Sequence, residues 1–321
     1  MRLKLLRLSM LSKEHKIRSE NGCLLLPILE DVSMGYPVVE REMERVESPA
    51  RSLMDVLDLP EEMKDEIPSS YEIVGDIAVI KVPEALEGYG RELGEALLRV
   101  HSSVKVALED SGVEGDLRVR HVVHLAGEER TRTVHREHGA EFVVDLSKAY
   151  FSPRLATERW RVVQQVSPGE TVLDMFAGVG PYSILISRNT EVQKVYAVDL
   201  NPEAVALLRE NVRRNKVEDV VETIQGDARD VDLKVDRVIM NLPHSARDFF
   251  TAALSCIKPD GGFIHYYEMI NDDDTESMTE ELKCVAGERG YNMEVLDIRE
   301  VRTYSATKTH VGVDMRIIPM Y

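Results

Sequence analysis

The second half of the chain predicts an α/β fold in which a seven-stranded, mostly parallel sheet is covered by helices on both faces. Seven apolar, strand-like runs follow one another between residues 171 and 317, and helical patterns separate most of them. Such alternation is typical of parallel sheets, because each helix returns the chain to the same edge. The last two strands, Met293–Ile298 and Val311–Ile317, have no helix between them, which predicts one antiparallel pair at the sheet edge.

The earlier strands of this sheet are expected at Thr171–Asp174, Lys194–Asp199, Val220–Gly226, Arg237–Asn241 and Gly262–Tyr267, and the helices at Pro202–Asn215, Arg247–Cys256 and Thr275–Arg289. Upstream, a strand with a central turn at Gly75, a helix over Glu84–His101 and strands over Leu117–His124 and Glu141–Asp145 predict an α+β domain. We therefore expect a small N-terminal module at 1–50, a middle domain at 51–147 and an α/β domain at 148–321.

Composition restricts the class of protein. The chain has 321 residues, enough for two or three domains, and has no apolar run long enough to cross a membrane, so we expect a cytoplasmic protein. Three scattered cysteines predict neither a disulfide framework nor a zinc site. The histidine pairs His121/His124 and His135/His138 lack a nearby third ligand, so no metal site is predicted.

The net charge of −17 argues against a nucleic-acid partner until its distribution is considered. Residues 1–20 carry six basic and two acidic side chains, and residues 116–165 carry nine and seven, so the acidic excess lies elsewhere. The basic stretch holds Arg118, Arg120, Arg130, Arg132 and Arg136. A solvated sheet face and a nucleic-acid contact are both compatible with this cluster.

A glycine-rich turn joins the first strand of the α/β domain to a helix that begins at Pro181. Gly178 and Gly180 let the backbone turn tightly and approach a ligand. A dinucleotide is disfavoured, because Ser183 stands where the third glycine of the dinucleotide fingerprint belongs.

Acidic residues follow three successive strands near this turn. Asp199 ends the second strand, where a carboxylate can bind ribose hydroxyls, and Asp227 follows the third. Asp174, at the end of the first strand, suits a cationic group, and S-adenosylmethionine combines an ammonium, a sulfonium and an adenosine. The run from Asp174 to Pro181 resembles the first motif of class I (Rossmann-like) methyltransferases.

The fourth strand ends in Asn241-Leu242-Pro243-His244. This turn resembles the Asn-Pro-Pro-aromatic loop of enzymes that methylate the amino nitrogens of bases, and Pro243 would fix it through its locked φ. A simple strand-to-helix turn, with Asn241 as a local cap, is the alternative.

The segment Asp145–Arg159 with the glycine turn and the Asn241–Pro243 turn resembles the archaeal and eukaryotic tRNA (guanine-N1)-methyltransferases that modify position 37. Further matches lie in Gly115–Arg120, His124–Glu128 and Val74–Ile77. The resemblance implies a class I methyltransferase domain behind an α+β RNA-binding domain and a small tRNA-docking module. It also implies S-adenosylmethionine as cofactor, tRNA as partner, no DNA or membrane partner, and a monomer.

The resemblance also implies the roles of individual residues. Glu158 falls on the general base, Arg118 on the arginine that contacts the target guanine, and Tyr150 and Asn241 on residues that enclose that base. Pro243, which would fix the turn after Asn241, completes the predicted catalytic residues. The cofactor-binding positions of the family, together with the glycine turn, fall on Arg159, Asp174, Phe176, Gly178, Gly180, Asp199, Leu200, Asp227, Ala228 and Asn241.

Guanine N1 bears a proton, so an enzyme that methylates this atom must remove the proton as the new bond forms. Glu158 could accept it. Burial by Tyr150, Phe151 and Trp160 would strengthen the base, whereas Arg154 and Arg159 would weaken it, and the sequence leaves that balance open.

Three other functions are compatible with parts of the sequence. An aminocarboxypropyl transferase of the wyosine pathway would use the same cofactor on the same region of tRNA. A bifunctional relative would also methylate a tricyclic guanine intermediate. A non-catalytic RNA-binding protein is disfavoured, because the acids at 174, 199 and 227 are intact.

Overall fold

The computed structural model describes residues 10–12, 14–30, 35–44, 52–114, 119–271, 274–305 and 308–320. The chain divides into two compact units, Met1–Val56 and Leu57–Tyr321. In the first unit, β1 (Arg18–Glu20) and β2 (Cys23–Leu25) form an antiparallel pair. Their two-residue connection is Asn-Gly, a pair that favours tight hairpins.

The second unit begins with a four-stranded sheet in the order β3-β4-β5-β6, in which β4 and β5 run parallel and the other neighbours antiparallel. Its strands are β3 (Tyr71–Val74), β4 (Ile77–Ile80), β5 (Val106–Glu114) and β6 (Val119–Gly127), and helix α2 (Gly90–Val100) packs against β5 and β6. Leu93 and Leu97 of α2 are fully buried, so the helix contributes an apolar face to this core.

A hairpin of β7 (Arg132–Glu137) and β8 (Ala140–Asp145) connects this sheet to the large one. On one side, Thr133 Oγ1 donates to Asp76 at 2.7 Å. On the other, the Asn211 side chain on α5 (Pro202–Arg214) bonds both backbone groups of Val143, at 2.7 and 3.0 Å. The hairpin is therefore fixed to both parts of the unit.

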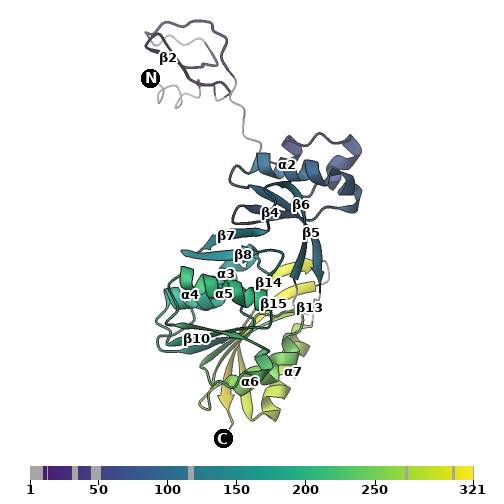
Figure 1. The fold of residues 1–321 in the computed structure, drawn as a ribbon, viewed down its shortest axis with the longest axis vertical. Coiled ribbons are helices and arrows are strands. Elements are labelled where there is room, and N and C mark those ends of the chain that lie inside the picture. The colour runs from purple at the N-terminus through teal and green to yellow at the C-terminus, as the bar shows by residue number, and fades with distance from the viewer. Residues whose placement is uncertain are drawn as a thin grey trace. The chain divides into compact units, whose positions relative to one another are not determined.

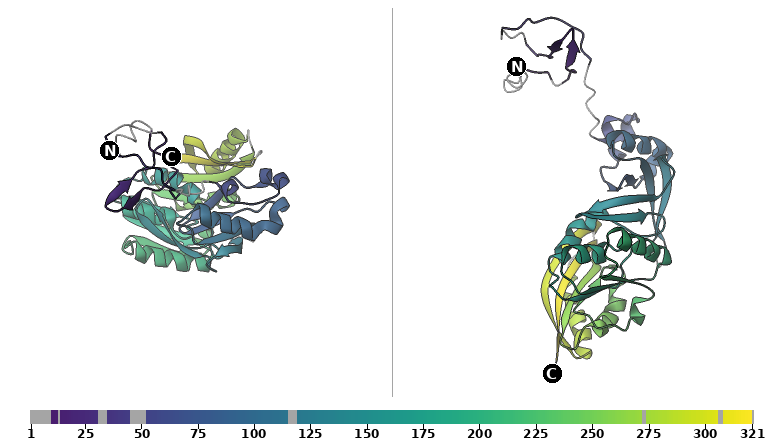
Figure 2. Two further views of the ribbon diagram at one scale, coloured as in Figure 1. Left: turned by 90° about the horizontal axis from the view of Figure 1, so that it is seen from above. Right: turned by 60° about the vertical axis from the view of Figure 1, so that its left-hand side comes forward.

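The large sheet has seven strands in the order β11-β10-β9-β12-β13-β15-β14. They are β9 (Thr171–Asp174), β10 (Lys194–Asp199), β11 (Val221–Gln225), β12 (Arg237–Met240), β13 (Gly262–Asn271), β14 (Tyr291–Ser305) and β15 (Lys308–Pro319). The first five in spatial order are parallel, and β15 is antiparallel to both β13 and β14. The predicted antiparallel pair is thus confirmed, and it forms one edge of the sheet (Figure 2).

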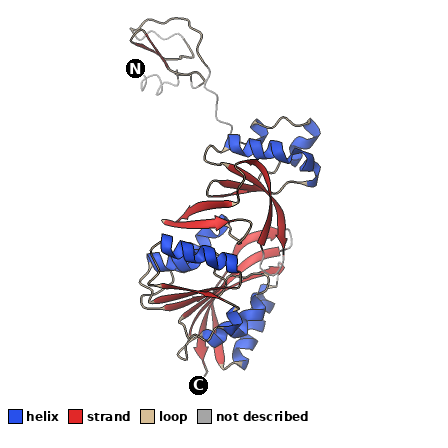
Figure 3. Cartoon of the chain, in the orientation of Figure 1, coloured by secondary structure: helices blue, strands red, loops and turns tan. Residues whose placement is uncertain are grey.

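Helices cover both faces of this sheet (Figures 1 and 3). One face carries α3 (Ala156–Val163), α4 (Pro181–Asn189) and α5, and the other carries α6 (Ala246–Cys256) and α7 (Thr275–Glu288). Each face has its own apolar core, so the α/β expectation is confirmed. The carboxyl ends of the parallel strands therefore lie between two layers of helices, where such sheets bind ligands.

Some element boundaries differ from the sequence prediction. The helix expected from Glu84 begins as a 3₁₀ segment, Glu84–Tyr89, and becomes α-helical at Gly90. Strand β5 was not predicted, because Glu109, Asp110 and Ser111 interrupt its apolar alternation. Across the described ranges, no helix combines the length and apolar character needed to cross a membrane.

Candidate active site

A cleft of about 940 Å³ lies at the carboxyl ends of the parallel strands. Its wall includes ten of the residues predicted for the site: Tyr150, Arg159, Phe176, Gly178, Asp199, Leu200, Asp227, Ala228, Asn241 and Pro243. Glu158, Asp174 and Gly180 lie outside the lining, and Arg118 falls outside the described residues. The fold thus gathers residues from segments up to about ninety positions apart around one cavity.

Gly178 and Gly180, in the turn after β9, have different structural roles. Both have positive φ, 57° at Gly178 and 90° at Gly180. A Cβ at Gly178 would meet only the Tyr150 carbonyl oxygen, at 3.7 Å, whereas a Cβ at Gly180 would lie 2.3 Å from Leu208 Cδ1. Gly178 therefore leaves the cleft open for a ligand, and Gly180 lets α4 pack against α5.

Asp199, at the end of the neighbouring strand β10, accepts hydrogen bonds that hold this turn in place. Its Oδ2 accepts a hydrogen bond from the Gly178 amide at 2.7 Å, and its Oδ1 accepts one from the Asn201 amide at 2.9 Å. Burial raises the pKa of the Asp199 carboxyl, and the two amide donors oppose that rise. The carboxylate is therefore held in a fixed orientation at the cleft wall.

Asp174 lies beneath the cleft and is completely buried. Its Oδ2 accepts a hydrogen bond from Ser183 Oγ at 2.7 Å, while its Oδ1 has no partner among the described protein atoms. Burial raises the pKa of this carboxyl to about 7, although the Ser183 hydroxyl acts in the opposite direction. A buried carboxyl with one unpaired oxygen is suited to a ligand that carries positive charge.

The turn after β12 faces the same cavity. Asn241 and Pro243 line it, and the Pro243 carbonyl accepts a hydrogen bond from the Met269 amide of β13 at 2.8 Å. The exposed ring of Tyr150 lines the same cavity and has the Arg120 guanidinium 6.0 Å from its centroid. This part of the cleft can enclose a planar group between an aromatic ring and a rigid turn.

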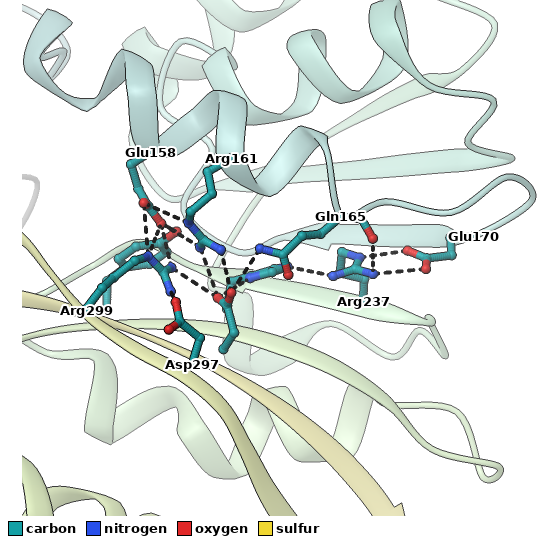
Figure 4. Close-up of polar contacts among 10 residues, drawn as sticks. Glu158, Arg161, Gln165, Glu170, Arg237, Asp297 and Arg299 are labelled. Carbon is teal, nitrogen blue, oxygen red and sulfur yellow. Dashed lines mark hydrogen bonds and ion pairs between the residues drawn. The ribbon is translucent and has the colours of Figure 1, made fainter.

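Glu158 on α3 lies behind the cleft wall and is only 8% exposed. Its carboxylate accepts hydrogen bonds from Arg161 at 2.8 and 3.0 Å, from Arg299 at 2.6 and 3.1 Å, and from the Tyr267 hydroxyl at 2.6 Å (Figure 4). Both carboxylate oxygens are therefore engaged. Any proton added to this carboxylate would therefore have to replace or share one of these hydrogen bonds.

The neighbours of Glu158 differ from those expected from the sequence. Arg154 pairs with Glu72 at 3.1 Å, and Arg159 pairs with Glu137 at 2.5 Å. The cations beside Glu158 are instead Arg161 and Arg299. Adjacent helical residues point in different directions, whereas residues three apart share a face, so Arg161 reaches Glu158 and Arg159 does not.

A second carboxylate, Asp314, stabilises the same cluster. It accepts hydrogen bonds from Arg161 at 2.5 Å, Arg299 at 3.1 Å and His265 at 2.7 Å. Despite burial, which opposes ionisation, the hydrogen bond from His265 and the other donors lower the pKa of Asp314 to about 2. Further hydrogen bonds through Gln165, Arg237 and Glu170 continue the network away from the cleft (Figure 4). Glu158 is thus held in place by a rigid ionic framework.

The arginines of the basic stretch are mostly involved in internal ion pairs. Arg120 pairs with Glu72, Arg130 with Asp76, Arg132 with Glu210 and Arg136 with Glu141. Each of these four described arginines therefore has an acidic partner. Much of the cluster that the sequence shows as local positive charge is neutralised within the fold.

Three polar residues of the site were missed by sequence reasoning. Tyr182 and His310 line the cleft, and each has a buried polar atom without a partner among the described protein atoms, the Tyr182 hydroxyl and His310 Nε2. Tyr267 connects them, with ring centroids 6.4 Å from Tyr182 and 5.8 Å from His310. The position of Tyr182 directly after Pro181 was the one available signal, since the other two lie in ordinary strand patterns.

Comparisons with known proteins identify the family. Residues 133–296 match the TRM5/TYW2 methyltransferase domain, and residues 51–131 match the TYW2 N-terminal domain. The chain is 43% identical to tRNA (guanine(37)-N(1))-methyltransferase Trm5b of Pyrococcus abyssi over 98% of this chain and 95% of that protein. It is 34% identical to a tRNA(Phe) (4-demethylwyosine(37)-C(7)) aminocarboxypropyltransferase of Methanocaldococcus jannaschii, over 77% of this chain and 97% of that protein.

A solved structure described as the complex of aTrm5 and tRNALeu resembles the fold with a TM-score of 0.84 and 35% identity, and the match covers 98% of this chain and 95% of that one. The family match spans more than half of the chain, and the similarity to Trm5b extends over nearly its whole length. The chain therefore belongs to the TRM5/TYW2 methyltransferase family.

Proposed function

We propose that this protein transfers a methyl group from S-adenosylmethionine to N1 of guanine 37 of tRNA. The observation that carries the proposal is one cleft that joins the acids and glycine turn of a cofactor site to the Asn241–Pro243 turn, with Glu158 directly behind its wall. The full-length similarity to Trm5b supports the same substrate and atom. We further propose a monomeric, cytoplasmic enzyme in which residues 51–147 contribute to tRNA binding.

The residues of the cleft fit S-adenosylmethionine. Asp199 would bind the ribose hydroxyls, Leu200 and Ala228 would contact the adenine, and Asp174 would balance the positive charge of the methionine part. Gly178 leaves room for the ligand, because it lines the cleft without a side chain and even a Cβ there would meet the Tyr150 carbonyl oxygen at 3.7 Å. When bound, the cofactor supplies an activated methyl group.

The protein's own residues would prepare the guanine for this transfer. Tyr150, Asn241 and Pro243 would hold the base flat in the cleft, with N1 towards Glu158. Glu158 would accept the N1 proton as the new N1–carbon bond forms, while Arg161 and Arg299 keep its carboxylate in place. Arg118 would stabilise the negative charge that develops on O6.

The test is incubation of the full chain with methyl-labelled S-adenosylmethionine and tRNA transcripts that carry G or A at position 37, followed by nucleoside mass spectrometry. We expect labelled 1-methylguanosine from the G37 transcript and no label in the A37 transcript. An absence of 1-methylguanosine would refute the proposal.

Aminocarboxypropyl transfer is the second candidate, because the domain match over residues 51–131 is to TYW2 and one relative carries that activity in its name. The same labelling separates the two reactions. A transferred aminocarboxypropyl group leaves the labelled methyl group on the sulfur product, so tRNA that carries 4-demethylwyosine would gain mass without label.

Asp174 predicts a pH dependence of cofactor binding. Its carboxyl has a pKa of about 7 in the folded protein, so it is largely neutral at low pH and ionised at high pH. We expect the affinity for S-adenosylhomocysteine, whose amino group stays charged, to rise between about pH 6 and pH 8 as Asp174 ionises. Calorimetric titration across this range is the measurement, and Asp174→Asn should remove the dependence.

The raised pKa of Asp174 also predicts how the stability of the folded protein depends on pH. Because the folded pKa of Asp174 is raised above its unfolded value, the carboxyl contributes stability that is fully present at low pH and is lost as pH rises through about 7. The ligand-free Asp174→Asn variant should therefore gain stability relative to wild type at high pH in chemical denaturation. Parallel stability curves for the two proteins would contradict the shift.

A further inference from the structure

His310, on β15, is a polar residue of the cleft to which neither the sequence motifs nor the mechanism above gives a role. It is 6% exposed and lines the cavity, and its Nε2 has no hydrogen-bond partner among the described protein atoms. A buried polar group without a partner is unfavourable, so a ligand that completes the hydrogen bond would stabilise the complex. Burial, assisted by the nearby Arg302, lowers the pKa of His310 to about 4, so the ring is neutral at physiological pH.

The fold places His310 between the two parts of the site that would act on guanine. Across the β13–β15 ladder it faces Met269, whose amide is bonded to the Pro243 carbonyl at 2.8 Å. On the same neighbouring strand, the ring of Tyr267 has its centroid 5.8 Å from that of His310, and the Tyr267 hydroxyl donates a hydrogen bond to Glu158. His310 is therefore next to both the Asn241–Pro243 turn and the carboxylate that would take the N1 proton.

A base oriented with N1 towards Glu158 presents the groups on either side of N1 to this corner of the cleft. One is O6, a hydrogen-bond acceptor, and the other is the 2-amino group, a donor. Arg302 lies opposite His310 in the register of β14 and β15, and Arg299 and Arg161 form ion pairs with Glu158. These cations favour a ligand atom that becomes negative during the reaction, and that atom is O6.

We propose that His310, as its Nε2–H tautomer, donates a hydrogen bond to O6 of the target guanine and stabilises the charge that builds there. In the balanced step, the N1 proton would move to Glu158 and the electron pair of the N1–H bond would form the N1–carbon bond. The carbon–sulfur bond of the methyl donor would break at the same time, with its electron pair staying on the sulfur that leaves, and the negative charge shared with O6 would exist only in the transition state. The inference rests on the proposed function, and it adds a second donor to the one expected from Arg118. A neutral donor suits this role, because it binds the developing charge without a buried cation in the ground state.

The test compares two transcripts, one with guanosine and one with 6-thioguanosine at position 37, because sulfur is a weak hydrogen-bond acceptor. Single-turnover methylation by His310→Phe should fall by about 100-fold on guanosine, in the range seen when one oxyanion donor is removed, and by about 10-fold or less on 6-thioguanosine. His310→Gln, which keeps an N–H donor, should recover much of the rate. Thr309→Ser is the matched control, because its side chain lies on the opposite face of β15.

Cofactor affinity by calorimetry and a circular dichroism spectrum establish that each variant is folded, and His310→Ala replaces His310→Phe if the larger ring prevents folding. Equal losses on the two transcripts would overturn the O6 contact. Inosine lacks the 2-amino group of guanosine. If His310→Phe did not lower the methylation rate on a transcript with inosine at position 37, the result would overturn the O6 contact and indicate that His310 contacts the 2-amino group. A wild-type enzyme that forms no 1-methylguanosine overturns the proposed function and the inference together, whereas an active wild type with His310→Phe equal to Thr309→Ser overturns only the inference.

Discussion

Glu158→Gln should lower the single-turnover rate of methyl transfer by about 100- to 10,000-fold, the range for loss of a general base. Glutamine has nearly the same shape as glutamate and can still accept hydrogen bonds from Arg299 and Tyr267, but it cannot take the N1 proton. The measurement is the rate of 1-methylguanosine formation with enzyme in excess over G37 tRNA. Because Glu158 lies outside the cleft lining, cofactor affinity should change by no more than about threefold.

Asp297→Asn is the matched control for this variant. Asp297 accepts a hydrogen bond from the same guanidinium, with Arg299 Nη1 to Asp297 Oδ2 at 2.8 Å, but its side chain is 53% exposed. If disturbance of Arg299 alone were responsible for the loss, both variants would slow the reaction. A normal rate in Glu158→Gln would refute the assignment of Glu158 as the base. A large loss of rate in Asp297→Asn would show that the position of Arg299, and not proton transfer to Glu158, accounts for the effect.

The α/β domain and the strand ends of its site could be predicted because their signals are local. Three predicted site residues stand at or directly after the carboxyl end of an apolar strand: Asp174, Asp199 and Asn241. Parallel strands place their carboxyl ends at one edge of the sheet, so these residues could be expected to lie together. The glycine turn was predictable in the same way, although only the structure shows that Gly178 lines the cleft whereas Gly180 packs against Leu208. Residues predicted from strand ends therefore lie in or directly beneath one cleft.

The surroundings of Glu158 could not be predicted, because they depend on contacts between distant strands. Arg299 and Asp314 reach α3 from β14 and β15, more than 140 positions along the chain. Sequence proximity suggested Arg154 and Arg159 instead, and both pair elsewhere. The basic stretch within residues 116–165 could not be interpreted from the sequence for a related reason: the sequence shows its positive charge, but only the fold shows that its described arginines pair with distant or neighbouring acids.

Asp199→Ala should weaken binding of S-adenosylmethionine by about 100-fold, since it removes hydrogen bonds to a charged acceptor that are worth about 1.5–3 kcal/mol each. Two effects combine in this loss. The ligand loses the carboxylate that would accept its ribose hydroxyls, and the Gly178 and Asn201 amides lose the acceptor that holds the turn at 2.7 and 2.9 Å.

Asp199→Asn separates the two effects of the alanine substitution. The asparagine keeps one oxygen acceptor, so it can still bind one of the two amides, but its amino group cannot accept from the ribose. We expect this variant to retain most of the stability of the wild type in thermal denaturation and yet to bind the cofactor weakly in calorimetry. Asp219→Ala, an exposed acid in the loop before β11, is the control for loss of one negative charge and should bind normally. Wild-type affinity in Asp199→Ala would mean that the ribose lies elsewhere in the cleft and that the Gly178 turn keeps its conformation without this carboxylate.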